Sequence, residues 1–213
     1  MPPSIAIIAG GSTVFLNSKL VEAYSENYSK IQLPNLPTAI VGPNLFHHNG
    51  TILLCGGQDN FLNSNKRCYQ LVGSSWKQHS SINQSRPYAS VAIANSCAFL
   101  FGGTKNPYTY EYLIQNSTNW EEGKSKIPGG FEIGSAIAIS QEEIWLIGGQ
   151  DTERRILSFN AKNHTFEELS TKLQDNRIRH ACALIPGTTN IIITGGAGEK
   201  RETLSRIAQP NVS

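Results

Sequence analysis

The chain has 213 residues, of which 39% are apolar and 16% are charged. This composition excludes a wholly disordered chain, because it supplies enough apolar surface to build a core. The 18 basic and 16 acidic side chains leave a net charge of +2, which does not indicate nucleic acid or an anionic membrane as the main partner.

The first residues, MPPSIAIIAGG, hold a short apolar run with no Lys or Arg before it. We interpret this run as a β-strand and not as a signal peptide. No apolar run in the sequence approaches the roughly 18 residues that cross a bilayer, so we expect no transmembrane segment.

An apolar run that ends in two glycines recurs five times: IAIIAGG, TILLCGG, CAFLFGG, IWLIGG and IIITGG. The first glycines stand at 10, 56, 102, 148 and 195, so the steps between them are 46, 46, 46 and 47 residues. A fixed period of this size is typical of repeat proteins. The glycine pairs are Gly10 and Gly11, Gly56 and Gly57, Gly102 and Gly103, Gly148 and Gly149, and Gly195 and Gly196.

The same signals follow each glycine pair in the same order. A polar loop precedes a short run with an aromatic residue, at 20–24, 68–71, 110–114 and 156–159. A tight turn then leads to a second run around a large residue: Ile31, Trp76, Trp120 or Phe166. Tyr69 and Trp76 are 7 residues apart, as are Phe159 and Phe166, and Tyr112 and Trp120 are 8 apart. We therefore expect each pair to pack on one face of two antiparallel strands.

Small and β-branched residues fill the last run of each period, at 89–94, 135–140 and 181–185, with a poorer match at 43–48. Four short strands per period, with no helical periodicity, predict an all-β fold of propeller blades whose innermost strand is this one. We expect a single domain over 1–213 with repeats at roughly 5–46, 47–94, 95–140, 141–185 and 186–213.

These residues resemble the kelch repeat, in which a double glycine is followed by a spaced tyrosine and tryptophan. The second copy, with Tyr69 and Trp76, is the clearest, and the third has Tyr112 and Trp120. The family often has an arginine that leads into the inner strand. Arg86 and Arg179 fill that position here, and Ile40 and Glu132 stand there in the other two copies.

The resemblance implies a propeller of six or seven blades, whereas this chain supplies about four and a half to five. It begins in a blade that lacks its inner strand and ends in one that lacks at least its outer strand. Either the chain forms a small five-bladed ring, or it is a fragment of a larger ring. We expect the fragment, because open sheet edges favour aggregation.

Cys55 precedes a glycine pair and Cys68 lies on the next predicted strand, so they could form a disulfide across a hairpin. The alternative is that both are small buried residues, as free cysteines often are. Cys97 and Cys182 have no evident partner, and no Cys/His spacing predicts a metal site.

Six N-x-S/T triplets without proline indicate glycosylation sites. Turns also favour these residue types for their own reasons, which weakens the excess of triplets as evidence for glycosylation. With the candidate disulfide, the triplets favour an extracellular protein or ectodomain over a cytoplasmic one. The first five lie in predicted turns of the repeats, and the asparagines are Asn27, Asn49, Asn83, Asn116, Asn163 and Asn211.

Basic side chains gather in two predicted loops: Arg154 and Arg155 in one, and Arg177, Arg179 and His180 in the other. They are candidates for binding a protein partner, but solvated turns are the explanation that the sequence favours. The resemblance implies a non-catalytic interaction or scaffold module without cofactor. The alternative is a kelch-type enzyme, similar to galactose oxidase or to a sugar-acid isomerase, but the predicted inner strands carry no acid or arginine. Fold alone does not decide function.

Overall fold

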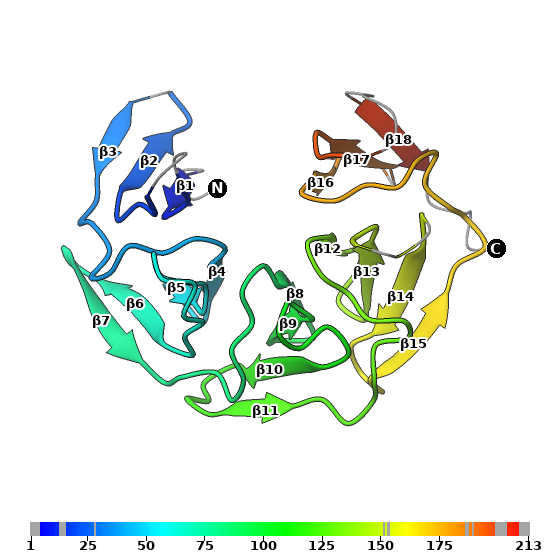
Figure 1. Cartoon of the computed structure of the whole chain (residues 1–213), viewed down its shortest axis with the longest axis horizontal. Coiled ribbons are helices and arrows are strands. Elements are labelled where there is room, and N and C mark those ends of the chain that lie inside the picture. The colour runs from blue at the N-terminus through cyan, green and yellow to red at the C-terminus, as the bar shows by residue number, and fades with distance from the viewer. Residues whose placement is uncertain are drawn as a thin grey trace.

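The structure is a computed structural model that describes residues 5–12, 16–27, 29–150, 152, 154–185, 188, 190–198 and 204–208. These residues form strands, turns and loops without a helix. The strands pair into five antiparallel sheets that are arranged as an arc around a common axis (Figure 1). The all-β prediction is therefore confirmed.

The first sheet has three strands and the next two sheets have four each. The first sheet contains β1 (Ile5–Ala9), β2 (Val21–Ser25) and β3 (Lys30–Gln32). The second contains β4 (Asn44–His48), β5 (Thr51–Cys55), β6 (Cys68–Val72) and β7 (Ser75–His79). The third contains β8 (Ser90–Ala94), β9 (Cys97–Phe101), β10 (Tyr110–Ile114) and β11 (Trp120–Glu122).

The fourth sheet again has four strands and the fifth has three. The fourth contains β12 (Ser135–Ala138), β13 (Glu143–Ile147), β14 (Ile156–Asn160) and β15 (Thr165–Glu168). The fifth contains β16 (Ala181–Leu184), β17 (Asn190–Thr194) and β18 (Leu204–Ala208). Each four-stranded sheet takes its first strand from the end of one predicted repeat and the other three from the next.

The strands β4, β8, β12 and β16 lie nearest the axis, and each contacts the next one in this order. This is the propeller-like arrangement that the small residues of these strands predict, because the sheets converge there. The first and fifth sheets stand at the two ends of the arc, and the described strands do not close a ring (Figure 1).

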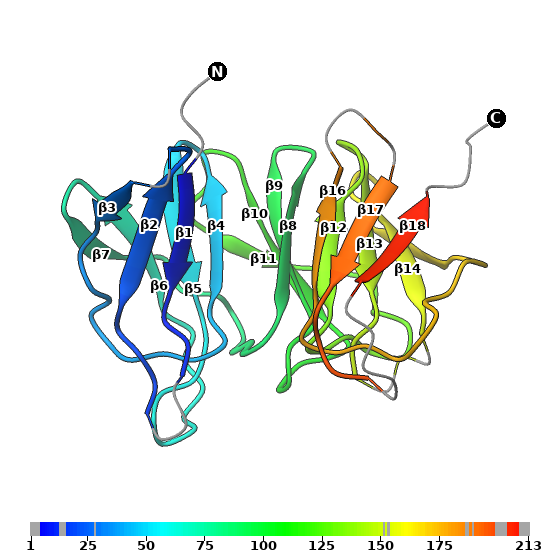
Figure 2. The ribbon, with the colours of Figure 1, turned by 90° about the horizontal axis from the view of Figure 1, so that it is seen from above.

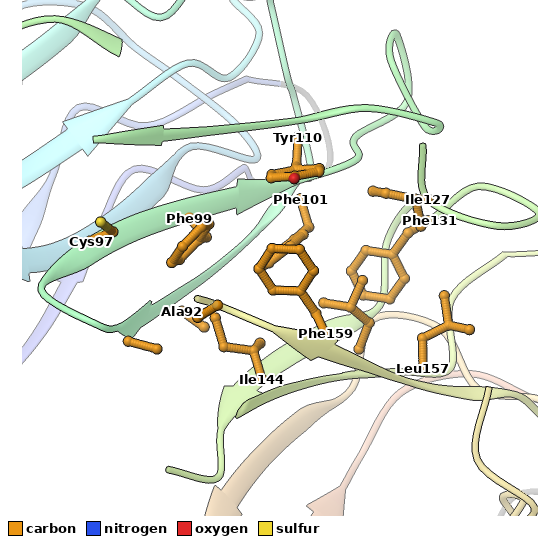
Figure 3. Packing of buried hydrophobic residues seen from close by; sticks show 13 residues of the cluster. Ala92, Cys97, Phe99, Phe101, Tyr110, Ile127, Phe131, Ile144, Leu157 and Phe159 are labelled. Atoms are coloured by element: carbon orange, nitrogen blue, oxygen red, sulfur yellow. The ribbon is translucent and has the colours of Figure 1, made fainter. Parts of the chain in front are cut away.

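Large apolar side chains fill the spaces between neighbouring sheets. Between the third and fourth sheets, Phe99, Phe101 and Phe159 point toward one another beneath Tyr110 (Figure 3). The ring of Phe159 lies 5.3 Å from that of Phe99 and 5.1 Å from that of Phe101, both in edge-to-face geometry. Such contacts bury large apolar areas and favour one relative placement of the two sheets.

Glycine pairs join neighbouring sheets at three junctions among the described residues. Gly102 has a φ of +64°, and a Cβ atom added there would lie 1.7 Å from the carbonyl oxygen of Phe131 in the loop of the fourth sheet. The neighbouring Gly103 donates its N–H to that oxygen over 3.0 Å. The close approach at Gly102 requires glycine, because only a residue without Cβ permits it. The same bond recurs from Gly11 to Ile40 and from Gly149 to Arg177, over 2.9 Å each.

The predicted packing of paired aromatics is correct in two sheets and wrong in one. Phe159 pairs directly with Phe166, and their ring centroids are 4.7 Å apart. Tyr69 and Trp76 share one buried cluster, since Trp76 pairs with Leu71 on the same face. Trp120, however, pairs with Leu113 and therefore lies on the face opposite Tyr112. A shift of one residue across the turn reverses the face of every later side chain.

Arg86 and Arg179, which we predicted to take equivalent positions before the inner strand, do not do so. Arg86 stands four residues before Ser90, which pairs with the residue that precedes Gly102. The equivalent residue before β16 is Arg177, because Ala181 pairs with the residue that precedes Gly195. By the same count, Phe131 and not Glu132 takes this position before β12. Ile40, Arg86, Phe131 and Arg177 are all buried.

Arg179 instead belongs to a second repeated position, two residues before the inner strand. The equivalent residues are Gly42, Tyr88 and Ile133, and all four have φ between +55° and +61°. Each donates its N–H to the carbonyl of the one before: Tyr88 to Gly42 over 3.0 Å, Ile133 to Tyr88 over 3.3 Å, and Arg179 to Ile133 over 2.8 Å. This chain of backbone bonds links four sheets around the axis.

Candidate binding surface

The loops divide between the two ends of the strands. The loops that follow the glycine pairs and the loops that lead into the inner strands lie at one end, which we call the glycine end. The tight hairpin turns lie at the opposite ends of the strands. The long loop after β5, at residues 58–66, projects from the glycine end beside the loop after β1 (Figure 2).

The loop 58–66, which we call the tip loop, exposes two large apolar side chains. Phe61 is 83% exposed and Leu62 is 72% exposed. Asp59 organises the turn, since one oxygen of its carboxylate accepts the N–H groups of Phe61 (2.8 Å) and Asn63 (2.9 Å). Leu62 has a φ of +61°, which is a costly conformation for a side-chain-bearing residue. The turn therefore holds the side chains of Phe61 and Leu62 in solvent, although the backbone conformation of Leu62 costs free energy.

Two further restraints hold the tip loop. Cys55 and Cys68 form a disulfide that joins β5 to β6 at the base of this loop. The disulfide prediction is thus confirmed, and the alternative of two free buried thiols is wrong. From the side, the backbone N–H of Asn17 donates to Oδ1 of Asn60 over 2.7 Å, and its amide donates to the carbonyl of Gln58 over 3.0 Å.

The five basic residues predicted to bind a partner differ in exposure. Arg177 and His180 are buried, so neither offers its side chain to a docking partner. Arg177 donates to the carbonyl of Gly195 over 3.1 Å, while partly buried Arg155 donates to Gly130 over 3.0 Å. Arg154 and Arg179 are exposed at the glycine end. Burial, followed by the nearby Arg177, lowers the pKa of His180 to about 4.

A hollow of about 570 Å³ lies at the axis, between the starts of the four inner strands. Hydroxyl groups in its wall join neighbouring sheets: Ser90 donates to the carbonyl of Gly134 (2.7 Å), and Ser135 donates to that of His180 (2.6 Å). The lining is Pro43, Asn44, Leu45, Ala89, Ser90, Val91, Gly134, Ser135, Ala136, His180, Ala181 and Cys182. Apart from His180, these groups are small, apolar or already hydrogen-bonded. The two ring nitrogens of His180 are buried and form no hydrogen bond to a described residue.

Of the two free cysteines, Cys182 lines the axial hollow and Cys97 is buried in the third sheet. Burial raises the pKa of the Cys97 thiol and raises that of Cys182 to about 11, so both are largely protonated at neutral pH. In the described part of the chain, no three His, Cys, Asp or Glu side chains are grouped so that they could hold a metal ion.

A buried ion pair, which sequence reasoning missed, fixes one loop of the glycine end. Nε of Arg86 donates to Glu111 over 2.7 Å, and neither side chain is exposed. The guanidinium also donates to the carbonyls of Gly102 (3.0 Å) and Thr109 (2.9 Å). Glu111 in turn accepts the backbone N–H of Gln84 over 2.9 Å. The pair thus ties three loop segments to β10.

The asparagines of five predicted glycosylation sites are exposed. Asn27, Asn49, Asn116 and Asn163 lie in hairpin turns, at the ends of the strands away from the glycine pairs. Asn83 lies in a loop of the glycine end, where its amide donates to the carbonyl of Trp120 over 2.9 Å. Asn211 lies outside the described residues.

No helix in the described residues has both the length and the apolar character needed to cross a membrane.

Comparison with known proteins bears on the fold. No protein-family model matches the sequence, and no curated protein is similar to it. Among solved structures, the chain is similar to the one titled "Structure of YjhT", with a TM-score of 0.74 and 14% sequence identity. The match covers 95% of this chain and 81% of that chain. At this level of identity, the likeness concerns the fold alone.

Proposed function

We propose that the chain is a kelch-type β-propeller module outside the cell that binds a protein partner through its glycine end, without catalysis or a cofactor. The five repeats and the likeness in fold to YjhT support the propeller assignment. The disulfide and the exposed glycosylation triplets support the extracellular placement.

The observation that carries the binding function is the tip loop. An exposed Phe-Leu pair is unfavourable in water, and here it is held by a disulfide, an aspartate-centred turn and a neighbouring loop. Preorganised apolar tips bind well, because little conformational entropy is lost on association. Exposed Lys66 and Arg67 follow the tip, so the matching partner has an apolar pocket with an acidic rim.

The axial hollow supports a non-catalytic role. A kelch-type enzyme would need acids, arginines or metal ligands that converge there. Small side chains, apolar side chains and bonded hydroxyls line it instead, and its one histidine is buried.

The test places a photo-crosslinking amino acid at Phe61 and, as a control, at Val72, which is exposed at the opposite end of β6. Proteins crosslinked on the surface of cells of the source organism are identified by mass spectrometry and purified. We expect Phe61→Ser to weaken binding of the purified partner about thirty-fold, as for a binding hot spot, and Val72→Ser to leave it unchanged. Equal binding by wild type and Phe61→Ser would refute the role of the tip.

A further inference from the structure

A hollow of about 530 Å³ opens between the third and fourth sheets, beside the glycosylation triplet of Asn163. We propose that this hollow seats the first sugar residue of an N-linked glycan on Asn163, so that the glycan becomes part of the junction between two sheets. The inference rests on the extracellular placement proposed above.

The triplet is arranged for modification. Oδ1 of Asn163 accepts the backbone N–H of Thr165 over 3.2 Å and the hydroxyl of the same residue over 2.6 Å. These bonds use the amide oxygen and not the amide nitrogen. The nitrogen is the atom to which an N-linked sugar would be attached. In the transfer, a bond forms from this nitrogen to the sugar, and the bond from the sugar to the diphosphate of a lipid-linked oligosaccharide breaks. The amide proton leaves to a base of the transferase.

The middle residue of the triplet anchors the turn on the third sheet. Nδ1 of His164 lies 3.1 Å from the hydroxyl of Tyr110. The backbone carbonyl of His164 accepts a hydrogen bond from the hydroxyl of Ser125 over 2.6 Å. Its ring stands perpendicular to that of Tyr112, with the centroids 4.8 Å apart. A glycan on Asn163 would therefore start from a fixed point at the mouth of the hollow.

The hollow suits a single sugar ring. Its volume falls within the range of about 300 to 1,000 Å³ that is usual for small-molecule sites. Tyr112 contributes an aromatic ring against which the C–H face of a sugar can pack, and exposed Lys124 supplies donors for hydroxyl and acetamide oxygens. Tyr112 lies on β10 of the third sheet, Lys124 lies in the loop after β11, and Asn163 lies in the β14–β15 turn of the fourth sheet. A seated sugar would therefore bridge the two sheets.

The experiment compares Asn163 with Asn116, which lies exposed in the β10–β11 turn. The full chain is secreted from a mammalian cell line behind a host signal peptide, and glycopeptide mass spectrometry measures the occupancy of each site. Peptide N-glycosidase is then applied to the native protein, and the release of each glycan is followed with time. We expect release at Asn163 to be at least about ten-fold slower than at Asn116, because seating hides the linkage, and the rates to become equal after denaturation.

A Tyr112→Leu variant should raise the native release rate at Asn163 to that at Asn116. Equal native rates in the wild type would overturn the seat and leave the extracellular placement intact. Asn163 unoccupied beside other occupied sites would overturn the seat alone. All sites unoccupied, with Cys55 and Cys68 as free thiols, would overturn both the seat and the extracellular placement.

Discussion

Removal of the Glu111 carboxylate should destabilise the protein strongly. In Glu111→Leu, the fully buried guanidinium of Arg86 loses its counter-charge, and the N–H of Gln84 loses its acceptor. Breaking a buried pair on one side typically costs about 3 to 5 kcal/mol. We expect a loss of this size in the free energy of unfolding, measured by urea denaturation and followed by tryptophan fluorescence.

The neighbouring sheet indicates how the loss can be reversed. The residue equivalent to Arg86 in the fourth sheet is Phe131, and the residue equivalent to Glu111 is Leu157; both belong to one buried apolar cluster. An Arg86→Phe/Glu111→Leu double variant copies this pair into the third sheet. Replacement of a buried ion pair by apolar side chains is often neutral, so the double variant should be no less stable than either single variant.

An exposed pair provides the control for the cycle. Lys30 and Glu22 form an ion pair at 3.0 Å on the surface, and Glu22→Gln should leave the urea midpoint unchanged. The reasoning would be refuted if Glu111→Leu cost less than about 1 kcal/mol, which is the loss expected of one ordinary hydrogen bond. It would also be refuted if the losses of the two single variants simply added in the double variant.

Two further predictions concern stability. Gly102→Ala should lower the free energy of unfolding by more than about 3 kcal/mol in urea denaturation, because the added Cβ would meet the carbonyl of Phe131. Gly73 has a positive φ but open space around it, so Gly73→Ala should lower the free energy of unfolding by about 1 to 2 kcal/mol. Equal losses in the two variants would contradict the role of close approach. Burial lowers the pKa of His180 to about 4 in the folded protein, below its value of about 6.5 in the unfolded chain. As the pH falls below 6.5, a proton therefore binds this side chain in the unfolded chain first. The free energy of unfolding should fall by up to about 3 kcal/mol between pH 6.5 and about 4. His180→Gln should flatten this pH dependence, and an unchanged slope would exclude His180 as its source.

The sequence by itself determined the strands and their order. Each strand is defined by a few neighbouring residues, and the period of 46 or 47 residues repeats them, so the positions of β5, β9, β13 and β17 follow from the glycine pairs. The disulfide was also within reach, because Cys55 and Cys68 flank one loop of a predicted hairpin. These features depend on contacts between strands that are adjacent in the chain.

The burial of loop residues and the pairing of distant side chains could not be predicted from the sequence, because both depend on strand register across irregular loops. Two basic residues, Arg177 and Arg179, precede β16, and the folded structure shows that the first is buried and the second exposed. The partner of Arg86 is Glu111, 25 residues away. Asn163 and Tyr112, which belong to different sheets, line one hollow. A shift of one residue in strand register moves a side chain to the opposite face of the sheet. The lengths of the loops set this register, and these lengths do not follow the repeat period in the sequence.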